Sequence, residues 1–134
     1  MIVIDASAFL EVLLGSKAGL TIEKMLDDDL LAPDLLDAEV FHQLVRAERR
    51  QVLSPIAAAD RTRLLREAPI ARIRCRELLV AARTFVAAVS GYDALYLALA
   101  ATMECPLLTT DARLARTATG QFGVAVTHVP TSGR

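Results

Sequence analysis

Three aspartates stand where predicted elements meet, and carboxylates placed in this way could bind a cation. Asp5 follows the apolar run Ile2–Ile4, and Asp111 follows a second buried run at Leu107–Thr110. Asp93 opens the most apolar helical stretch of the chain. Acids that end two neighbouring parallel strands would lie close together, and clustered carboxylates repel one another unless a cation neutralises them. Oxygen ligands without cysteine or histidine favour Mg²⁺ or Mn²⁺ over zinc.

Each acid also has an ordinary structural explanation. Asp5, Asp93 and Asp111 each stand at the start of a predicted helix, where an aspartate can act as the N-cap. Glu39 lies in the middle of a predicted helix, at the margin of its apolar stripe, and could form an ion pair with Arg46. Taken singly, the three aspartates are evenly balanced between capping and chemistry, and the ion pair is the simpler reading of Glu39. Capping explains less well why two of them should follow buried strands.

The elements that must position these acids alternate between short apolar strands and helices. This order predicts an α/β fold, a parallel sheet with helices on both faces, in a single domain over residues 1–134. Ligands of such sheets bind beyond the carboxyl ends of the strands. We expect strands at Ile2–Ile4, Leu30–Ala32, Ile70–Arg74, Pro106–Thr109 and Val124–Val129, and helices at Ser7–Leu14, Leu20–Asp28, Asp34–Arg50, Ser54–Glu67, Glu77–Val89, Asp93–Met103 and Asp111–Thr119.

The composition favours a packed core with an apolar surface that a partner covers. Hydrophobic residues make up 54% of the 134 residues, yet the longest apolar run, Ala94–Ala101, is too short to span a membrane. The start of the chain lacks a basic leader, so we expect no signal peptide and a cytoplasmic protein with reduced thiols at Cys75 and Cys105. The net charge is −1. Seven arginines lie between Arg61 and Arg83. They could bind phosphate groups, or they could keep exposed helices soluble.

Four segments of the sequence resemble the motifs of the PIN-domain ribonucleases, and specifically of the VapC-type toxins. The resemblance covers essentially the whole chain, with the motifs in the family's order and spacing. Each motif is modest alone, but the four in register are specific. They are Ile2–Ala8, Ala32–Val40, Tyr92–Ala100 and Leu107–Leu114.

This resemblance implies a PIN-like three-layer sandwich with a central parallel sheet of four to five strands. It implies a Mg²⁺- or Mn²⁺-dependent endoribonuclease, using one or two ions and metal-activated water to cleave RNA phosphodiesters. It further implies a homodimeric toxin of a type II toxin–antitoxin pair, inhibited by a VapB-like antitoxin. Carried over by position, Asp5, Asp93 and Asp111 would bind the metal, with Asp5 and Asp93 foremost. Glu39 would complete the catalytic group, directly or through water.

Other residues near the motifs are candidates for substrate contacts. Ser7 and Thr110 stand beside the acids and could orient water or a phosphate, although capping of the backbone is an equal alternative. We expect Arg46, Arg113 and Arg116 to contact substrate phosphates.

One departure from the family pattern stands at His42, where the family often has asparagine. His42 could hydrogen-bond a carboxylate or the substrate, but a solvent-facing histidine is the favoured reading. Two other functions are open: a PIN-fold interaction module without activity, or a receiver-type phosphoacceptor domain. A receiver needs a lysine late in the chain, whereas the lysines here are Lys17 and Lys24.

Overall fold

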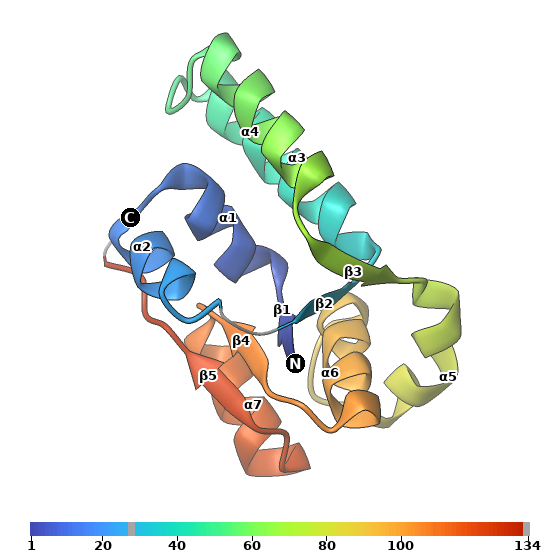
Figure 1. Cartoon of the computed structure of the whole chain (residues 1–134). Coiled ribbons are helices and arrows are strands. Elements are labelled where there is room, and N and C mark those ends of the chain that lie inside the picture. The colour runs from blue at the N-terminus through green and yellow to red at the C-terminus, as the bar shows by residue number, and fades with distance from the viewer. Residues whose placement is uncertain (27–28, 133–134) are drawn as a thin grey trace.

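A computed structural model describes residues 1–26 and 29–132, which form a parallel sheet flanked by helices (Figure 1). Within this part of the chain the sheet has five strands in the order β3-β2-β1-β4-β5, and all neighbouring pairs are parallel. The predicted α/β class and all five predicted strands are confirmed. The strands are β1 (Ile2–Ile4), β2 (Leu30–Pro33), β3 (Ile70–Ile73), β4 (Leu107–Thr109) and β5 (Val126–His128).

The described residues contain seven α-helices. The central one, α6, is apolar on nearly all sides, so residues 94–100 are all buried, and α6 contacts β1, β2 and β4. Helix α1 lies on the other side of the strands in Figure 1 and packs against α2, α3 and α4. The helices are α1 (Ala6–Leu14), α2 (Lys17–Glu23), α3 (Leu35–Arg49), α4 (Pro55–Glu67), α5 (Leu79–Ala82), α6 (Gly91–Met103) and α7 (Ala112–Phe122).

Two of the predicted helices are wrong in extent. The helix expected at Leu20–Asp28 begins earlier, because Ser16 accepts a hydrogen bond from the Gly19 backbone N–H at 3.0 Å and caps α2. Its expected end, at residues 27–28, lies outside the described residues. The continuous helix expected at Glu77–Val89 is instead the short α5 between two 3₁₀ turns, Cys75–Leu78 and Arg83–Phe85. Several β-branched residues in this stretch lower its helix propensity.

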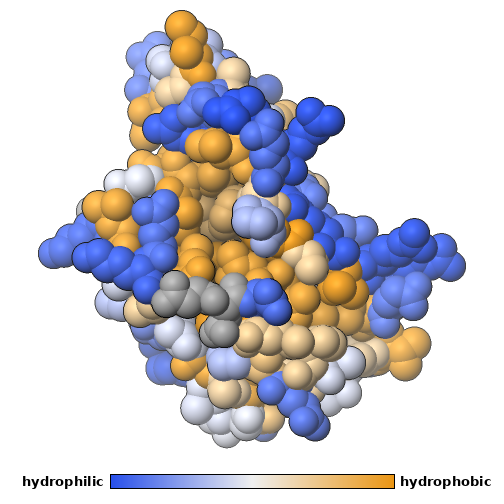
Figure 2. Space-filling model, in the orientation of Figure 1, coloured by the Kyte–Doolittle hydropathy of each residue, from blue (hydrophilic) through white to orange (hydrophobic). Residues whose placement is uncertain are grey.

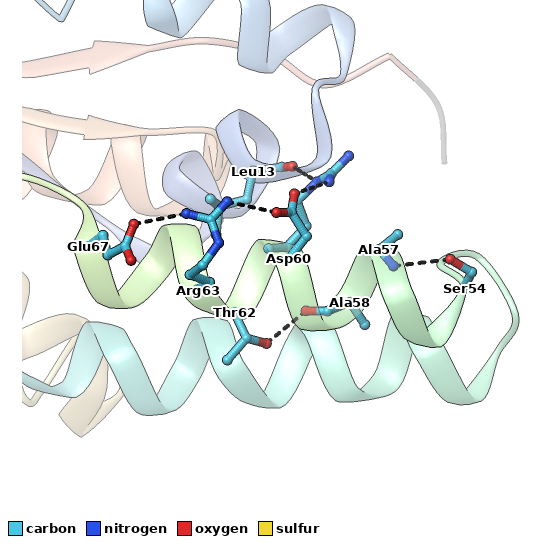
Figure 3. A network of polar contacts seen from close by, with 9 residues as sticks. Leu13, Ser54, Ala57, Ala58, Asp60, Thr62, Arg63 and Glu67 are labelled. Atoms are coloured by element: carbon cyan, nitrogen blue, oxygen red, sulfur yellow. Dashed lines mark hydrogen bonds and ion pairs between the residues drawn. The ribbon is translucent and has the colours of Figure 1, made fainter.

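Helices α3 and α4 form a hairpin that projects from the sheet (Figure 1). An arginine side chain ties the hairpin to the end of α1, since Arg61 Nε donates to the Leu13 carbonyl at 2.8 Å. On the exposed side of α4, Arg63 lies between Asp60 and Glu67 at 2.8 and 2.9 Å (Figure 3). Such exposed pairs contribute little stability. The guanidinium groups of Arg61 and Arg63 nevertheless both contact other residues of the protein.

Arg72 is also engaged within the protein. Its guanidinium donates to the carbonyls of Leu65 and Ala68 at 2.6 and 2.7 Å, at the C-terminal end of α4. It also forms an ion pair with Asp37 of α3 at 3.0 Å. These contacts satisfy carbonyls that a helix end leaves open. Of the seven arginines between 61 and 83, these three thus serve the fold.

An apolar hollow opens at the edge of the sheet where β1, β2 and β3 begin. Figure 2 shows hydrophobic residues gathered in it, and its volume is about 890 Å³. Met1, Phe9, Leu64 and Ile70 are among the residues that line it. The acids follow the opposite ends of the strands. In the described residues, no helix combines the length and the apolar character that crossing a bilayer requires.

Candidate active site

The two acids that follow strands, Asp5 and Asp111, come from neighbouring strands. β1 pairs with β4 through Val3 with Leu107 and Ile4 with Leu108. The chain places β2 and β3 on one side of β1 and β4 and β5 on the other. In open parallel sheets, this reversal of strand order leaves a crevice at the carboxyl ends. The condition under which these two acids would lie close together, that their strands are neighbours, is therefore met.

Asp5 is buried, with 5% of its surface exposed, and it caps α1. Its Oδ1 accepts hydrogen bonds from the Ser7 hydroxyl at 2.7 Å and the Ala8 backbone N–H at 2.9 Å. Its Oδ2 accepts a hydrogen bond from the Thr109 hydroxyl. Burial raises the pKa of Asp5 to about 6 against the opposing effect of these donors, and the charge of Asp93 raises it further. Asp5 is therefore the N-cap of α1, and its burial disfavours its charged form.

The hydroxyls that hold Asp5 also hold the loop after β4. Ser7 Oγ accepts the Thr110 backbone N–H at 3.1 Å, and Thr109 Oγ1 accepts the Asp111 backbone N–H at 3.0 Å. Thr109 is fully buried. A single hydroxyl thus links Asp5 to the backbone of Asp111. The sequence pattern did not distinguish Thr109 from the other residues of a buried strand.

Asp111 is exposed and caps α7, because its Oδ1 accepts the Leu114 backbone N–H at 3.1 Å. The structural explanation considered for Asp111 therefore holds, as it does for Asp5. A cap of this kind uses one carboxylate oxygen, so capping and a chemical role are compatible for both acids.

Asp93 is not a helix cap. Ser90 caps α6, and its Oγ accepts the Asp93 backbone N–H at 3.1 Å. Asp93 lies in the first turn of the helix, half-buried. Burial and the charge of Asp111 raise its pKa, whereas a hydrogen bond with Ser90 lowers it. The capping alternative is thus wrong for Asp93.

Glu39 is half-buried on α3, and its Oε1 accepts a hydrogen bond from the Tyr96 hydroxyl of α6 at 2.8 Å. Burial and the charge of Asp93 raise the pKa of Glu39, and the Tyr96 hydroxyl lowers it. The alternative of an ion pair with Arg46 does not appear in the described part of the chain. Tyr96, like Thr109, is a site residue that the sequence pattern assigned to the core.

Asp93 connects the four acids electrostatically, since it raises the pKa values of Asp5 and Glu39 and is itself affected by Asp111. Across residues 1–26 and 29–132, none of the four forms an ion pair with a lysine, arginine or histidine. Hydroxyls and backbone N–H groups hold them instead. Among the same residues, no three Asp, Glu, His or Cys side chains converge closely enough to surround a metal ion alone.

Of the three arginines predicted to contact substrate, one shares a pocket with two of the acids. Arg113 lines a pocket of about 310 Å³ together with Asp93 and Asp111. Arg116 lies three residues further along α7 and is exposed, and Arg46 lies on α3, half-exposed.

Two further polar residues were singled out in the sequence. Thr110 contributes backbone atoms to the network, because its carbonyl lies 3.3 Å from His128 Nε2 and its N–H donates to Ser7. His42 is exposed, and its imidazole forms no side-chain hydrogen bond within the described residues, which agrees with the favoured reading of a solvent-facing side chain.

Known proteins resemble this chain over most of its length. The PIN domain family matches residues 2–120, a range that contains all four acids. The chain is 37% identical over 133 residues to VapC ribonuclease Mb0985 of Mycobacterium bovis, covering 97% of this chain and 99% of that protein. It is 38% identical over 120 residues to ribonuclease VapC1 of Mycobacterium tuberculosis, covering 84% and 87% of the two chains. Ribonuclease VapC3 of the same species is 33% identical, with 86% and 85% covered. The chain therefore belongs to the PIN domain family.

Proposed function

We propose that this protein is a Mg²⁺- or Mn²⁺-dependent endoribonuclease and the toxin of a type II toxin–antitoxin pair. The observation that carries the proposal is a group of four acids, from the β1–α1 junction, α3, α6 and the β4–α7 loop, whose charge no basic side chain of the described residues neutralises. Relatives named VapC ribonucleases support RNA as the substrate.

The donor set fits a hard divalent cation. It consists of carboxylate oxygens, and Mg²⁺ is commonly held by one or two carboxylates, keeping several waters and taking further oxygens from substrate phosphates. A complete protein cage is therefore not required. We assign Asp5, Asp93 and Asp111 as the residues that would hold one or two ions, with Glu39 completing the group. The mutual effect of these charges on pKa supports the assignment, because a cation would relieve it.

When bound, a divalent cation lowers the pKa of water and offsets charge on the scissile phosphate. The chain's own residues would provide the positions. Ser7 and Thr109 fix both oxygens of Asp5 and the backbone that carries Asp111. Arg113 lines the same pocket as two of the acids, so we assign it to a substrate phosphate. Ser7, Thr110, Arg46 and Arg116 remain substrate contacts in this proposal.

The partners follow from the same proposal. We propose a VapB-like antitoxin, a homodimer, a cytoplasmic location and a single domain over residues 1–134. Exposed apolar side chains at Leu79 and Val80 support a surface that a second copy covers. A receiver-type domain is not favoured, because Lys17 and Lys24 are both exposed on or beside α2 and pair with none of the four acids in the described residues.

The test is cleavage of end-labelled RNA by the purified protein with Mg²⁺ or with excess EDTA. We expect Asp93→Asn and Glu39→Gln to abolish or strongly reduce cleavage. Glu48→Gln is the matched control, because Glu48 is an exposed acid on the same helix as Glu39. Cleavage that is equally fast in EDTA, or undiminished in Asp93→Asn, would contradict the proposal. Loss of cleavage on addition of a small protein encoded beside this one would support the toxin–antitoxin assignment.

A further inference from the structure

Tyr96 contacts the acid group without being an acid itself. It is on α6, three residues after Asp93, and 1% of its surface is exposed. Its hydroxyl donates to Glu39 Oε1 at 2.8 Å, joining residues that are 57 positions apart. A buried tyrosine hydroxyl requires a hydrogen-bond partner, and here that partner is a member of the proposed catalytic group.

We propose that Tyr96 is a positioning residue that fixes Glu39 for cation binding and cleavage. This inference rests on the proposed function and adds to it a role for a residue outside the acid group. Because Tyr96 engages Oε1, the other oxygen, Oε2, is the one that Glu39 would offer to a cation or to cation-bound water.

The need for such a residue follows from the conformational freedom of glutamate. Ordering a glutamate side chain costs rotamer entropy, because several of its bonds rotate freely in solvent. The negative charge of Asp93 also disfavours the charged form of Glu39. A free Glu39 would lower this repulsion by turning towards solvent. The hydrogen bond to Tyr96 opposes that movement.

A hydroxyl suits this task better than a basic side chain. Burial and the neighbouring charge of Glu39 hold the pKa of Tyr96 far above its ordinary value, so Tyr96 stays a donor. It adds no positive charge, so the negative charge of the group remains available to a cation. Asp93 and Tyr96 are also three residues apart, on the same side of α6. One helix thus carries one acid of the group and the donor that orients another.

The central test compares Tyr96→Phe with Tyr92→Phe. Tyr92 is on the same helix but 62% exposed, so its variant is the matched control. We expect Tyr96→Phe to weaken Mn²⁺ binding, measured by calorimetry without RNA, and to lower kcat by about 10- to 100-fold, a usual effect of removing the partner of a metal ligand. KM for RNA should change little. In a Glu39→Gln background, Tyr96→Phe should cause no further loss, because the residue acts through Glu39.

A second measurement keeps the tyrosine in place, so it does not depend on whether Tyr96→Phe folds. The chain has two tyrosines. Protein labelled with ¹³C at the tyrosine ring carbon that bears the hydroxyl gives two signals, which Tyr92→Phe assigns. Titration with Mg²⁺ should shift the Tyr96 signal, with the midpoint that calorimetry gives for Mg²⁺ itself, and leave the Tyr92 signal unchanged.

The outcomes separate the two proposals. If the wild-type protein shows no cation-dependent cleavage, the proposed function fails, and the role of Tyr96 fails with it. If the wild type cleaves RNA but folded Tyr96→Phe matches Tyr92→Phe in Mn²⁺ affinity and kcat, the positioning role alone is overturned. A Tyr96 signal that does not respond to Mg²⁺ in an active protein overturns it as well.

Discussion

Replacing Asp5 with asparagine is expected to stabilise the cation-free protein at neutral pH while removing the proposed activity. Burial raises the pKa of this acid from its ordinary value of 3.8 to about 6. Folding therefore disfavours its charged form. The resulting loss of stability is absent below pH 3.8, grows as the pH rises, and is complete above about pH 6. At roughly 1.4 kcal/mol per pKa unit, the full effect is about 3 kcal/mol.

Asparagine should keep the hydrogen bonds that Asp5 makes as the N-cap of α1. Its amide oxygen can accept the Ala8 backbone N–H and the Ser7 hydroxyl, and asparagine is as good an N-cap as aspartate. Its amide nitrogen would face Thr109, whose hydroxyl can turn to accept a hydrogen bond. The substitution therefore changes mainly the charge.

The assay is urea unfolding in EDTA at pH 4 and at pH 8. We expect Asp5→Asn to exceed the wild type in unfolding free energy by up to about 3 kcal/mol at pH 8 and to match it near pH 4. Asp60→Asn is a control of opposite sign. Hydrogen bonds and ion pairs with Arg63 and Arg61 lower the pKa of Asp60, so its charge stabilises the fold above its ordinary pKa. An Asp5→Asn protein no more stable than the wild type at pH 8, or equally stabilised at pH 4, would refute the reasoning.

Two other substitutions test the packing and the hydroxyl network. In Gly19→Ala, the added Cβ would lie 2.0 Å from the Glu11 carbonyl oxygen, so thermal denaturation should show a loss of about 1–3 kcal/mol or more. Gly120→Ala, with nothing within 4 Å of its Cβ on α7, should instead gain about 0.5–1 kcal/mol, and an equal response of both variants would contradict the clash. Thr109→Val should cost about 1–3 kcal/mol in chemical denaturation, because it removes a partner of Asp5 and of the Asp111 N–H, and it should also slow RNA cleavage. Thr109→Ser should restore most of both, and a Thr109→Val protein with wild-type cleavage would show that the link does not matter.

The sheet was predictable because its strands are short, continuous apolar runs. Ile2–Ile4 and Leu107–Leu108 are typical of strands buried on both faces, and both runs are buried in the structure. Even the edge strand Ile70–Ile73 was expected, although it is less buried than β1. The pattern was less informative around α5, where alanines and β-branched residues alternate. There the contacts with α6 decide the local structure.

The acids of the site were predictable and the groups that hold them were not. Asp93 looked like a cap because it begins the apolar stretch, yet Ser90 supplies the cap from three residues earlier. Tyr96 and Thr109 stand within runs that any hydrophobic pattern assigns to the core. What distinguishes them is one hydroxyl each, directed at an acid 57 or 104 positions away. A partner at that separation exists only once the chain has folded.

The long sequence separation between Asp5 and Thr109 also decides when the candidate active site can form during synthesis. β1 is the central strand of the sheet, but its neighbour β4 follows more than a hundred positions later. While the chain is being synthesised, the edge of β1 that pairs with β4 stays unpaired. Thr109 and Asp111 are added more than a hundred residues after Asp5. Contacts this distant in sequence form slowly. Under the proposed function, a nascent chain therefore cannot cleave RNA until β4 and the residues that follow it have been made.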